Sequence, residues 1–353
     1  MVGSACALEL ARANLRVTVI DPGGSEGQGW RAAAGLLSPQ VEAREEDPLL
    51  DLGVAGREYY RSHQQELEAA GGTVGLTLDG VLRLAATEDE SEQLKDAVAW
   101  QRQHGLYCEW LGEDEVREQW PWLGASFGAL LAPNDGSLDP VRLVNALTAV
   151  AAQLGVQRLV DRIRRLEVAD GRVTGAVGDV RHQAPRVVLA AGSWSGRLEG
   201  LPRPVSVEPV RGQMLAVVRP QGLTDFTAFG HGHYVLTRGD EVLIGATVEH
   251  VGFDAGVTRA GLDAIAAAAA RICPALAGLP PVRTWAGLRP GTPDGLPIIG
   301  REPRVEGLWY ATGHGRNGIL LAGVTAAIIE QQMRGEPTIE AVHAFRPERF
   351  WDR

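Results

Sequence analysis

Apolar and polar residues follow two patterns along the chain, and each pattern predicts a different kind of element. Apolar residues three or four positions apart predict helices, whereas continuous or alternating apolar runs predict strands. The helical pattern covers residues 3–12, 50–70, 87–104, 260–272 and 319–333. The strand pattern covers residues 16–21, 207–218, 233–237, 242–247 and 308–311. Helices and strands are therefore expected along the whole chain.

Turn and capping residues divide the middle of the chain further. Asp139 followed by Pro140 is a helix N-cap with proline at the first helical position, so a helix is expected to begin there. Residues 74–84 form an apolar run interrupted by an Asp-Gly pair, which predicts two strands joined by a turn. Short strands are expected within 155–180, and a buried strand beginning at Arg186 runs into a turn of small residues.

The first helix and strand have the order of a nucleotide-binding βαβ unit. Asp21 ends the strand eighteen positions after Gly3, where such units place the acid that bonds the adenosine ribose. The expected fold class is α/β: a Rossmann-like (βαβ) domain that binds the cofactor, with a second α+β substrate domain built on an antiparallel sheet. The first domain is assigned residues 1–46, 135–200 and 280–353, and the substrate domain is assigned residues 47–134 and 201–279.

Only the second half of that unit is recognised in the sequence. The usual first half is a strand followed by Gly-x-Gly-x-x-Gly, and here Met1 and Val2 directly precede Gly3. Each apolar side chain of such a central strand contributes about 1.5–3 kcal/mol by burial, against a net domain stability of about 5–15 kcal/mol. We therefore expect the natural protein to begin roughly a dozen residues before Met1, the length of the strand and its glycine turn.

A glycine-framed segment from Trp285 to Leu321 contains the candidate chemistry. Arg289 has no acidic neighbour before Asp294, so its guanidinium is available to a ligand carboxylate. The strand at 308–311 is followed by a glycine-rich turn and a helix, whose N-terminal amides favour an anionic ligand. Each feature has a simpler explanation when it is taken alone: the glycines could form a plain strand-to-helix connection, and Arg289 could pair with a distant acidic residue. Together the features indicate a flat anionic cofactor beside a small acid.

Composition narrows the classes of function. The 353 residues favour about two domains, and the net charge of −10 argues against a nucleic-acid partner. The sequence has no apolar run of membrane-spanning length and no export signal, so a cytoplasmic protein without an integral membrane segment is expected. Cys6, Cys108 and Cys273 are widely spaced, which predicts free thiols. His231 and His233 lack a third ligand nearby, so a solvated hairpin is favoured and no metal is expected.

Two motifs resemble a known family. They are Trp285-Ala-Gly-Leu-Arg-Pro-Gly-Thr-Pro-Asp-Gly and Gly313-His-Gly-Arg-Asn-Gly-Ile-Leu-Leu. Both are similar to the glycine oxidase branch, linked to thiamine biosynthesis, of the FAD-dependent D-amino-acid oxidase superfamily. The resemblance extends from Gly3 to about Gln332. Flavin D-amino-acid dehydrogenases have a similar arginine motif, whereas the sequence from Arg316 favours the glycine oxidase branch.

The resemblance implies FAD as the cofactor. FAD should be noncovalent, because Cys273 lies too far upstream of the arginine motif to match the cysteine that tethers the flavin in related sarcosine oxidases. The positions that match the family's cofactor contacts are Gly3, Ser4, Asp21, Ala33, Ala34, Gly35, Ile163, Gly192, Gly313, His314, Gly315, Asn317, Gly318 and Ile319.

The resemblance also implies oxidation of a small amino acid or amine. FAD would take the α-hydrogen as a hydride and leave an imine, and O₂ would become hydrogen peroxide. Arg289 would clamp the substrate carboxylate, and Tyr234 would bond it too, with an ordinary strand aromatic as the alternative. Arg316 would touch the substrate or brace the flavin turn, and Val248 stands where a glycine oxidase has methionine. No side chain is assigned as acid or base.

Two further functions remain open from the sequence. A D-amino-acid dehydrogenase would pass its electrons to a quinone instead of O₂. A chain without the first strand could also be an inactive, flavin-free binding protein. The expected partners are a small amino acid and O₂, with assembly into a homo-oligomer left open.

Overall fold

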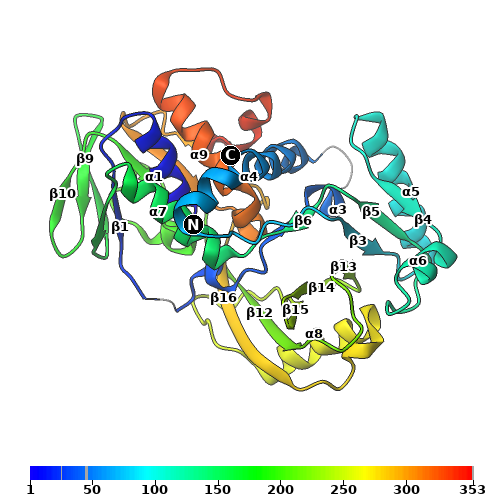
Figure 1. Cartoon of the computed structure of the whole chain (residues 1–353). Helices are drawn as coiled ribbons and strands as arrows, with labels where there is room; N and C mark the ends of the chain where they lie inside the picture. Colours follow the sequence, from blue (N-terminus) through cyan, green and yellow to red (C-terminus); the bar gives the residue numbers. More distant parts are fainter. Residues whose placement is uncertain (25, 44–46, 352–353) are drawn as a thin grey trace.

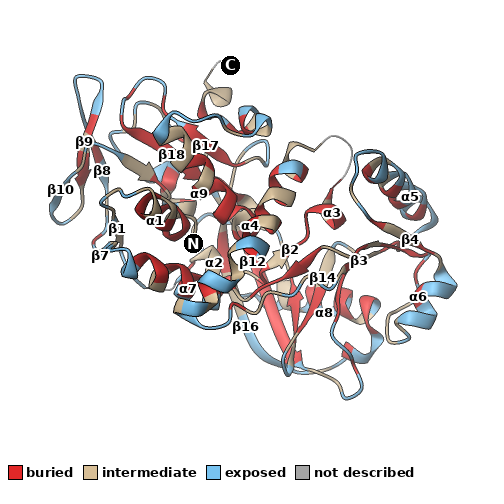
Figure 2. Cartoon of the chain, turned by 45° about the horizontal axis from the view of Figure 1, so that its top comes forward, coloured by how far each residue is buried: buried red, intermediate tan, exposed pale blue. Residues whose placement is uncertain are grey.

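Four helices pack around the largest hydrophobic cluster of the molecule. In the computed structural model, which describes residues 1–24, 26–43 and 47–351, these helices are α1 (Val2–Arg12), α4 (Pro48–Gly71), α7 (Pro140–Gln153) and α9 (Gly318–Arg334) (Figure 1). Helix α9 packs between α1 and α4 and is mostly buried (Figure 2). Leu8, Leu147 and Leu321 meet in this cluster with no exposed surface. The apolar faces predicted from the sequence therefore form this core.

Side-chain caps begin four of the long helices, among them α5 (Glu88–Gln103), where the Thr87 hydroxyl accepts from the Glu90 amide. The carboxylate of Asp139 accepts hydrogen bonds from the backbone amides of Val141 and Arg142 at the start of α7, at 2.9 and 3.1 Å. Asp47 caps α4, and Thr258 caps α8 (Arg259–Ile272) in the same way. These bonds satisfy amides that have no partner within the helix. The helix start predicted at Asp139 is confirmed.

Two small sheets each contain one parallel pair of strands. One pairs β1 (Thr18–Asp21) with β7 (Gln157–Val160), and the other pairs β11 (Val187–Leu189) with β18 (Leu308–Thr312), which is also antiparallel to β17 (Ile298–Arg301). Helix α1 packs against both β1 and β11. Within the described residues these two strands are not paired with each other, and both line one large cavity.

An eight-stranded sheet forms the other half of the molecule. Its strand order is β16 (Pro281–Gly291), β12 (Glu208–Val218), β15 (Glu241–Gly245), β14 (His233–Arg238), β13 (Thr227–Gly230), β3 (Val81–Leu84), β5 (Ala129–Ala132) and β4 (Glu109–Leu111). All neighbours are antiparallel except β13 and β3. Helix α8 covers one face, where Ile265 and Ile272 pack on Val235 and Ile244 (Figure 1). The predicted fold class is confirmed.

Shorter elements connect and cover these layers. They are α2 (Gly29–Ala32), α3 (Pro39–Glu42), α5 (Glu88–Gln103), α6 (Glu113–Gln119), β2 (Leu36–Leu37), β6 (Gly136–Ser137), β8 (Arg165–Ala169), β9 (Arg172–Val177), β10 (Arg181–Gln183) and the 3₁₀ turns η1 (Gly192–Arg197), η2 (Pro274–Leu276), η3 (Gly315–Asn317), η4 (Glu340–Phe345) and η5 (Pro347–Phe350). The outer face of α5 and most of α6 are exposed (Figure 2).

One local prediction is wrong. Residues 74–84 do not form two paired strands, since only β3 forms there and it pairs with β5 and β13. Thr77 instead exchanges backbone hydrogen bonds with Ser137, so its amide and carbonyl are taken by another segment. The hydrophobic pattern located the extended chain, and a partner distant in the sequence decided its pairing.

The division into two domains remains a prediction, and two elements pack across it. Helix α4, assigned to the substrate domain, packs on α7 and α9. Strand β16, assigned to the cofactor domain, pairs along its length with β12. The boundary at residue 46 lies outside the described residues.

Candidate active-site cleft

A cleft of about 3030 Å³ runs between the helical half and the eight-stranded sheet. It extends from the ends of β1 and β7 to Tyr234 and Arg289 on the sheet. Ordinary small-molecule pockets measure about 300–1,000 Å³, so this cleft has room for a large cofactor and a substrate. Every site residue expected from the sequence lines it except Gly313.

The β1 end of the cleft has the groups that bind a nucleotide in a βαβ unit. Gly3 and Ser4 lie in the first turn of α1, and Asp21 ends β1. One carboxylate oxygen of Asp21 accepts a hydrogen bond from the Gly23 amide at 2.9 Å, which orients the side chain. Ile163 lines the same end. The donor amides of the helix start and the acceptor carboxylate fit a dinucleotide.

Main-chain contacts fix the middle of the cleft at Ala33, Ala34 and Gly35. Arg238 donates from Nη2 to the Ala34 carbonyl at 2.5 Å and to the Leu138 carbonyl at 2.8 Å. Gly35 has φ +83°, and a Cβ there would lie 1.9 Å from the Leu138 oxygen, so only glycine fits. The small side chains leave the backbone of this segment open to a planar ligand.

The turn between β18 and α9 faces the cleft from the other side. Gly313 has φ +72° and packs against Thr292, behind the cleft wall. His314 is buried and its Nε2 lies 3.0 Å from Thr325 Oγ1. Burial lowers the pKa of His314 to about 3, so its ring is neutral. Gly315, Asn317, Gly318 and Ile319 line the cleft, as does Gly192, whose carbonyl accepts a hydrogen bond from Thr312 Oγ1 at 3.3 Å.

Arg289 is the cationic side chain at the sheet end of the cleft. Its Nη1 donates to the backbone carbonyls of Thr247 at 2.9 Å and Arg211 at 3.4 Å. Within the described residues it has no ion pair with a carboxylate. Burial lowers its pKa, yet the ordinary pKa of arginine is so high that the guanidinium remains charged. A half-buried cation that is held only by neutral carbonyls of the described residues retains donors for an anionic ligand.

Tyr234 faces the same end of the cleft from β14. Its hydroxyl donates to the sulfur of Met214 at 3.5 Å, a weak acceptor. Burial raises the pKa of Tyr234 to about 12, although the charge of Arg289 opposes the shift. The tyrosine is therefore a neutral donor beside a cation.

The other two predicted substrate residues lie at the margin of the cleft. Val248 lines it and is 71% exposed, so it borders the opening. Arg316 forms an ion pair from Nε to Glu42 Oε2 at 2.6 Å, with its side chain 68% exposed. Glu42 was not singled out from the sequence, because nothing in the pattern around α3 shows that it meets a residue so far along the chain.

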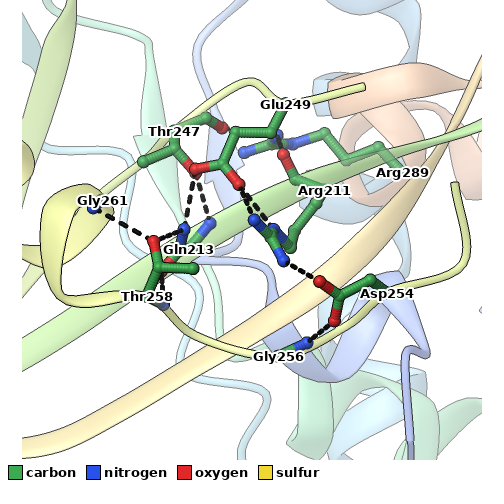
Figure 3. Close-up of polar contacts among 9 residues, drawn as sticks. All are labelled: Arg211, Gln213, Thr247, Glu249, Asp254, Gly256, Thr258, Gly261 and Arg289. Atoms are coloured by element: carbon green, nitrogen blue, oxygen red, sulfur yellow. Dashed lines mark hydrogen bonds and ion pairs between the residues drawn. The ribbon is translucent and has the colours of Figure 1, made fainter. Parts of the chain in front are cut away.

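Sequence reasoning also missed the residues around Arg289. Arg211, Gln213 and Glu249 form a hydrogen-bonded cluster next to it (Figure 3). The alternation of β12 predicts a strand but does not show which residue of it faces Arg289. His231 and His233, by contrast, lie in the predicted hairpin: His231 has φ +51° between β13 and β14, and His233 begins β14.

Comparison with known proteins identifies the class. A family profile described as DAO, FAD dependent oxidoreductase, matches residues 1–332. Glycine oxidase of Geobacillus kaustophilus is 33% identical over 347 residues, which cover 96% of this chain and 92% of that protein. The bifunctional protein ThiO/ThiG of Synechocystis sp. is 34% identical over 99% of this chain and 53% of its own length. The chain belongs to the FAD-dependent oxidoreductase family, and FAD is its cofactor.

A solved structure supports the same assignment. The crystal structure of glycine oxidase from Geobacillus kaustophilus superposes with a TM-score of 0.92 at 32% identity, covering 98% of this chain and 95% of that one. The resemblance stated from the two sequence motifs is thus confirmed. No described helix is both long and apolar enough to cross a membrane.

Proposed function

We propose that this protein is an FAD-dependent oxidase of glycine or another small amino acid or amine. The observation that supports it most directly is the half-buried guanidinium of Arg289, which faces a cofactor-sized cleft and, within the described residues, is held by backbone carbonyls alone. The relatives named as glycine oxidases support the same substrate class. The amino acid would lose two hydrogens to become an imine, and O₂ would become hydrogen peroxide.

The residues of the cleft divide between cofactor and substrate. The starts of α1 and α9, Asp21, and the segment 33–35 would hold FAD, which supplies the hydride acceptor when bound. Arg289 would bind the substrate carboxylate bidentately, and the Tyr234 hydroxyl would donate to the same group. Two anchors on one carboxylate would fix the direction of the α-carbon, as a reacting distance of about 3–3.5 Å requires. The substrate would react with a neutral amine, so no side chain is assigned a proton transfer.

Replacement of Arg289 tests the proposal. Arg289→Leu should lower kcat/KM for glycine by at least about 30-fold, because loss of one partner of a buried ion pair costs about 2–5 kcal/mol. Arg289→Lys should recover little, since an ammonium does not reproduce the planar fork. Peroxide release in air and flavin content would be measured together. Arg283→Leu is the matched control, because Arg283 lies on the same strand in an exposed ion pair with Glu241.

The outcomes separate the candidate functions. Full turnover by Arg289→Leu would refute the role of Arg289. A flavin-loaded wild type that oxidises D-amino acids with an artificial acceptor and releases no peroxide in air would be a dehydrogenase. Purified wild type that takes up no flavin would contradict both assignments.

A biosynthetic role and a location complete the proposal. The fused relative is named ThiO/ThiG, which supports a role in thiamine biosynthesis. The three cysteines are buried and unpaired, which fits a reducing, cytoplasmic environment.

A further inference from the structure

The two carbonyls that accept from the Arg289 guanidinium belong to Arg211 and Thr247, which do not line the cleft. The segment 247–249 runs alongside β12, where the amide of Arg211 donates to the Glu249 carbonyl at 2.9 Å and the amide of Glu249 donates back at 3.0 Å. The Thr247 amide donates to the Gln213 carbonyl at 3.3 Å. These bonds place the Thr247 and Arg211 carbonyls, and both carbonyls accept from Arg289.

Side-chain hydrogen bonds also hold the segment 247–249 against β12 (Figure 3). One oxygen of Glu249 accepts from Arg211 Nε at 2.5 Å and also pairs with Nη2, and the other accepts from Gln213 Nε2 at 2.7 Å. Arg211 Nη1 also donates to Asp254 at 2.6 Å. The Gln213 oxygen accepts from the amide of Thr258 at 2.6 Å. Arg211 and Gln213 are buried, so little water competes with these bonds.

Glu249 is the centre of this cluster. Burial works to raise its pKa, but hydrogen bonds from Arg211 and Gln213 outweigh that effect and the pKa is lowered. The carboxylate is therefore ionised at neutral pH. Because it bonds two side chains of β12 from the far end of the segment, it determines how closely residues 247–249 follow that strand.

Gly212 leaves the space that the guanidinium occupies. Arg289 pairs with Val210 across the two strands, so Gly212 is its diagonal neighbour on the same face. A Cβ at Gly212 would lie 2.2 to 2.4 Å from Nη2, Cζ and Nη1 of Arg289. Such distances are far below van der Waals contact, which for carbon begins near about 3.5 Å. Any side chain at position 212 displaces the guanidinium.

We propose that Glu249, with Arg211 and Gln213, and Gly212 are positioning residues for the carboxylate clamp Arg289. Glu249 fixes the two carbonyls that hold the guanidinium, and Gly212 provides the flat surface beneath it. The inference rests on the proposed function for the identity of the ligand, while the placement of Arg289 itself is independent of any ligand.

Two variants test the proposal from opposite sides. Glu249→Gln removes the charge with little change of shape and should raise KM for glycine about 10-fold while kcat changes less than about 3-fold, as expected for loss of uniform binding. Gly212→Ala should lower kcat/KM about 100-fold, because a displacement of about 1 Å misaligns the reacting atoms. Flavin content and thermal midpoint should stay close to wild type.

Matched controls and a double variant separate positioning from general damage. Glu241→Gln breaks an Arg–Glu pair on the same sheet away from Arg289, and Gly112→Ala adds a methyl group where the nearest atom is 3.5 Å away; both should leave KM unchanged. In an Arg289→Leu background, Glu249→Gln should cost nothing further, because its effect passes through Arg289.

Crystal structures give a readout that needs no turnover. The Arg289 guanidinium should be displaced in both variants, by about 1 Å or more in Gly212→Ala, as overpacking requires. The inference would be overturned if the guanidinium does not move in the variants. It would also be overturned if the wild type oxidises glycine and Glu249→Gln has the same KM. A wild type without glycine oxidation would overturn the proposed function instead, and the two crystal structures would still decide the placement of Arg289.

Discussion

Arg289 and Tyr234 illustrate what single residues reveal before a structure is known. Arg289 could be singled out because glycines and prolines surround it and no acid is near, and the structure places it without a carboxylate partner in the described chain. Tyr234 could not be distinguished from a strand aromatic by its neighbours. Gly212 and Glu249 gave no signal. Gly212 meets Arg289 through the register between β12 and β16, and Glu249 is linked to it only through the bonds that hold residues 247–249 against β12.

Tyr234 gives a prediction on pH. Burial holds its pKa near about 12, above the ordinary value of about 10. Tyr234→Phe should lower kcat/KM for glycine about 10- to 150-fold, which corresponds to the roughly 1.5–3 kcal/mol of one hydrogen bond to a charged group, and by the same factor at pH 7 and pH 10. Steady-state peroxide assays at both values check this, and an effect that vanishes at pH 10 would contradict it.

The same shift has a consequence for stability. Between about pH 10 and pH 12 the folded protein retains the Tyr234 proton that the unfolded chain has begun to lose. The unfolded state then binds fewer protons, so the free energy of unfolding falls as the pH rises through this range. Tyr234→Phe should remove that part of the alkaline decline.

At the scale of elements, the helices and most strands could be predicted from apolar spacing, and their pairing could not. Helix α9 was expected over 319–333 and is observed at Gly318–Arg334. The failed strand pair at 74–84 shows the limit: Thr77 bonds Ser137, sixty positions away. Periodicity reports which face of an element is buried, and the partner that buries it is set by the whole fold.

The contact of α4 with α9 supplies a prediction at this scale. A Cβ on Gly56 would lie 2.3 Å from the Leu320 carbonyl oxygen, and Tyr60 donates from its hydroxyl to the Ile319 carbonyl at 2.6 Å. Gly56→Ala should therefore force the helices apart, at a cost of about 1–3 kcal/mol in the free energy of unfolding. Helix α9 begins directly after the glycine-rich turn that follows β18, which is predicted to contact FAD. The affinity for FAD should therefore fall as well.

Denaturant unfolding and a flavin fluorescence titration measure these two effects. The same substitution at Gly112, where nothing lies closer than 3.5 Å, is the control and should be neutral. Equal stability of the two variants would show that α4 and α9 can separate without cost, contrary to the close packing described above.

At the scale of the molecule, the wide spacing of the three cysteines predicted that they are free thiols. Cys6, Cys108 and Cys273 are free and buried, and burial raises the pKa of Cys6 to about 12 and of Cys108 to about 11. Since the thiolate is the reactive form, an aromatic disulfide reagent at pH 8 should find no reactive thiol in the folded protein and three after unfolding in guanidinium. Rapid labelling of the native protein would contradict this.

The two backbone carbonyls that hold Arg289 are neutral, and this affects the electrostatics of the whole molecule. The chain carries a net charge of −10, yet the inner end of its cleft holds a positive charge that no described acidic side chain within ion-pair distance balances. Such a spot gathers mobile counter-ions from the medium. If Arg289 binds the substrate carboxylate as proposed, chloride or acetate in a buffer would compete with the amino acid for it, so the same arrangement would make turnover sensitive to ordinary salt.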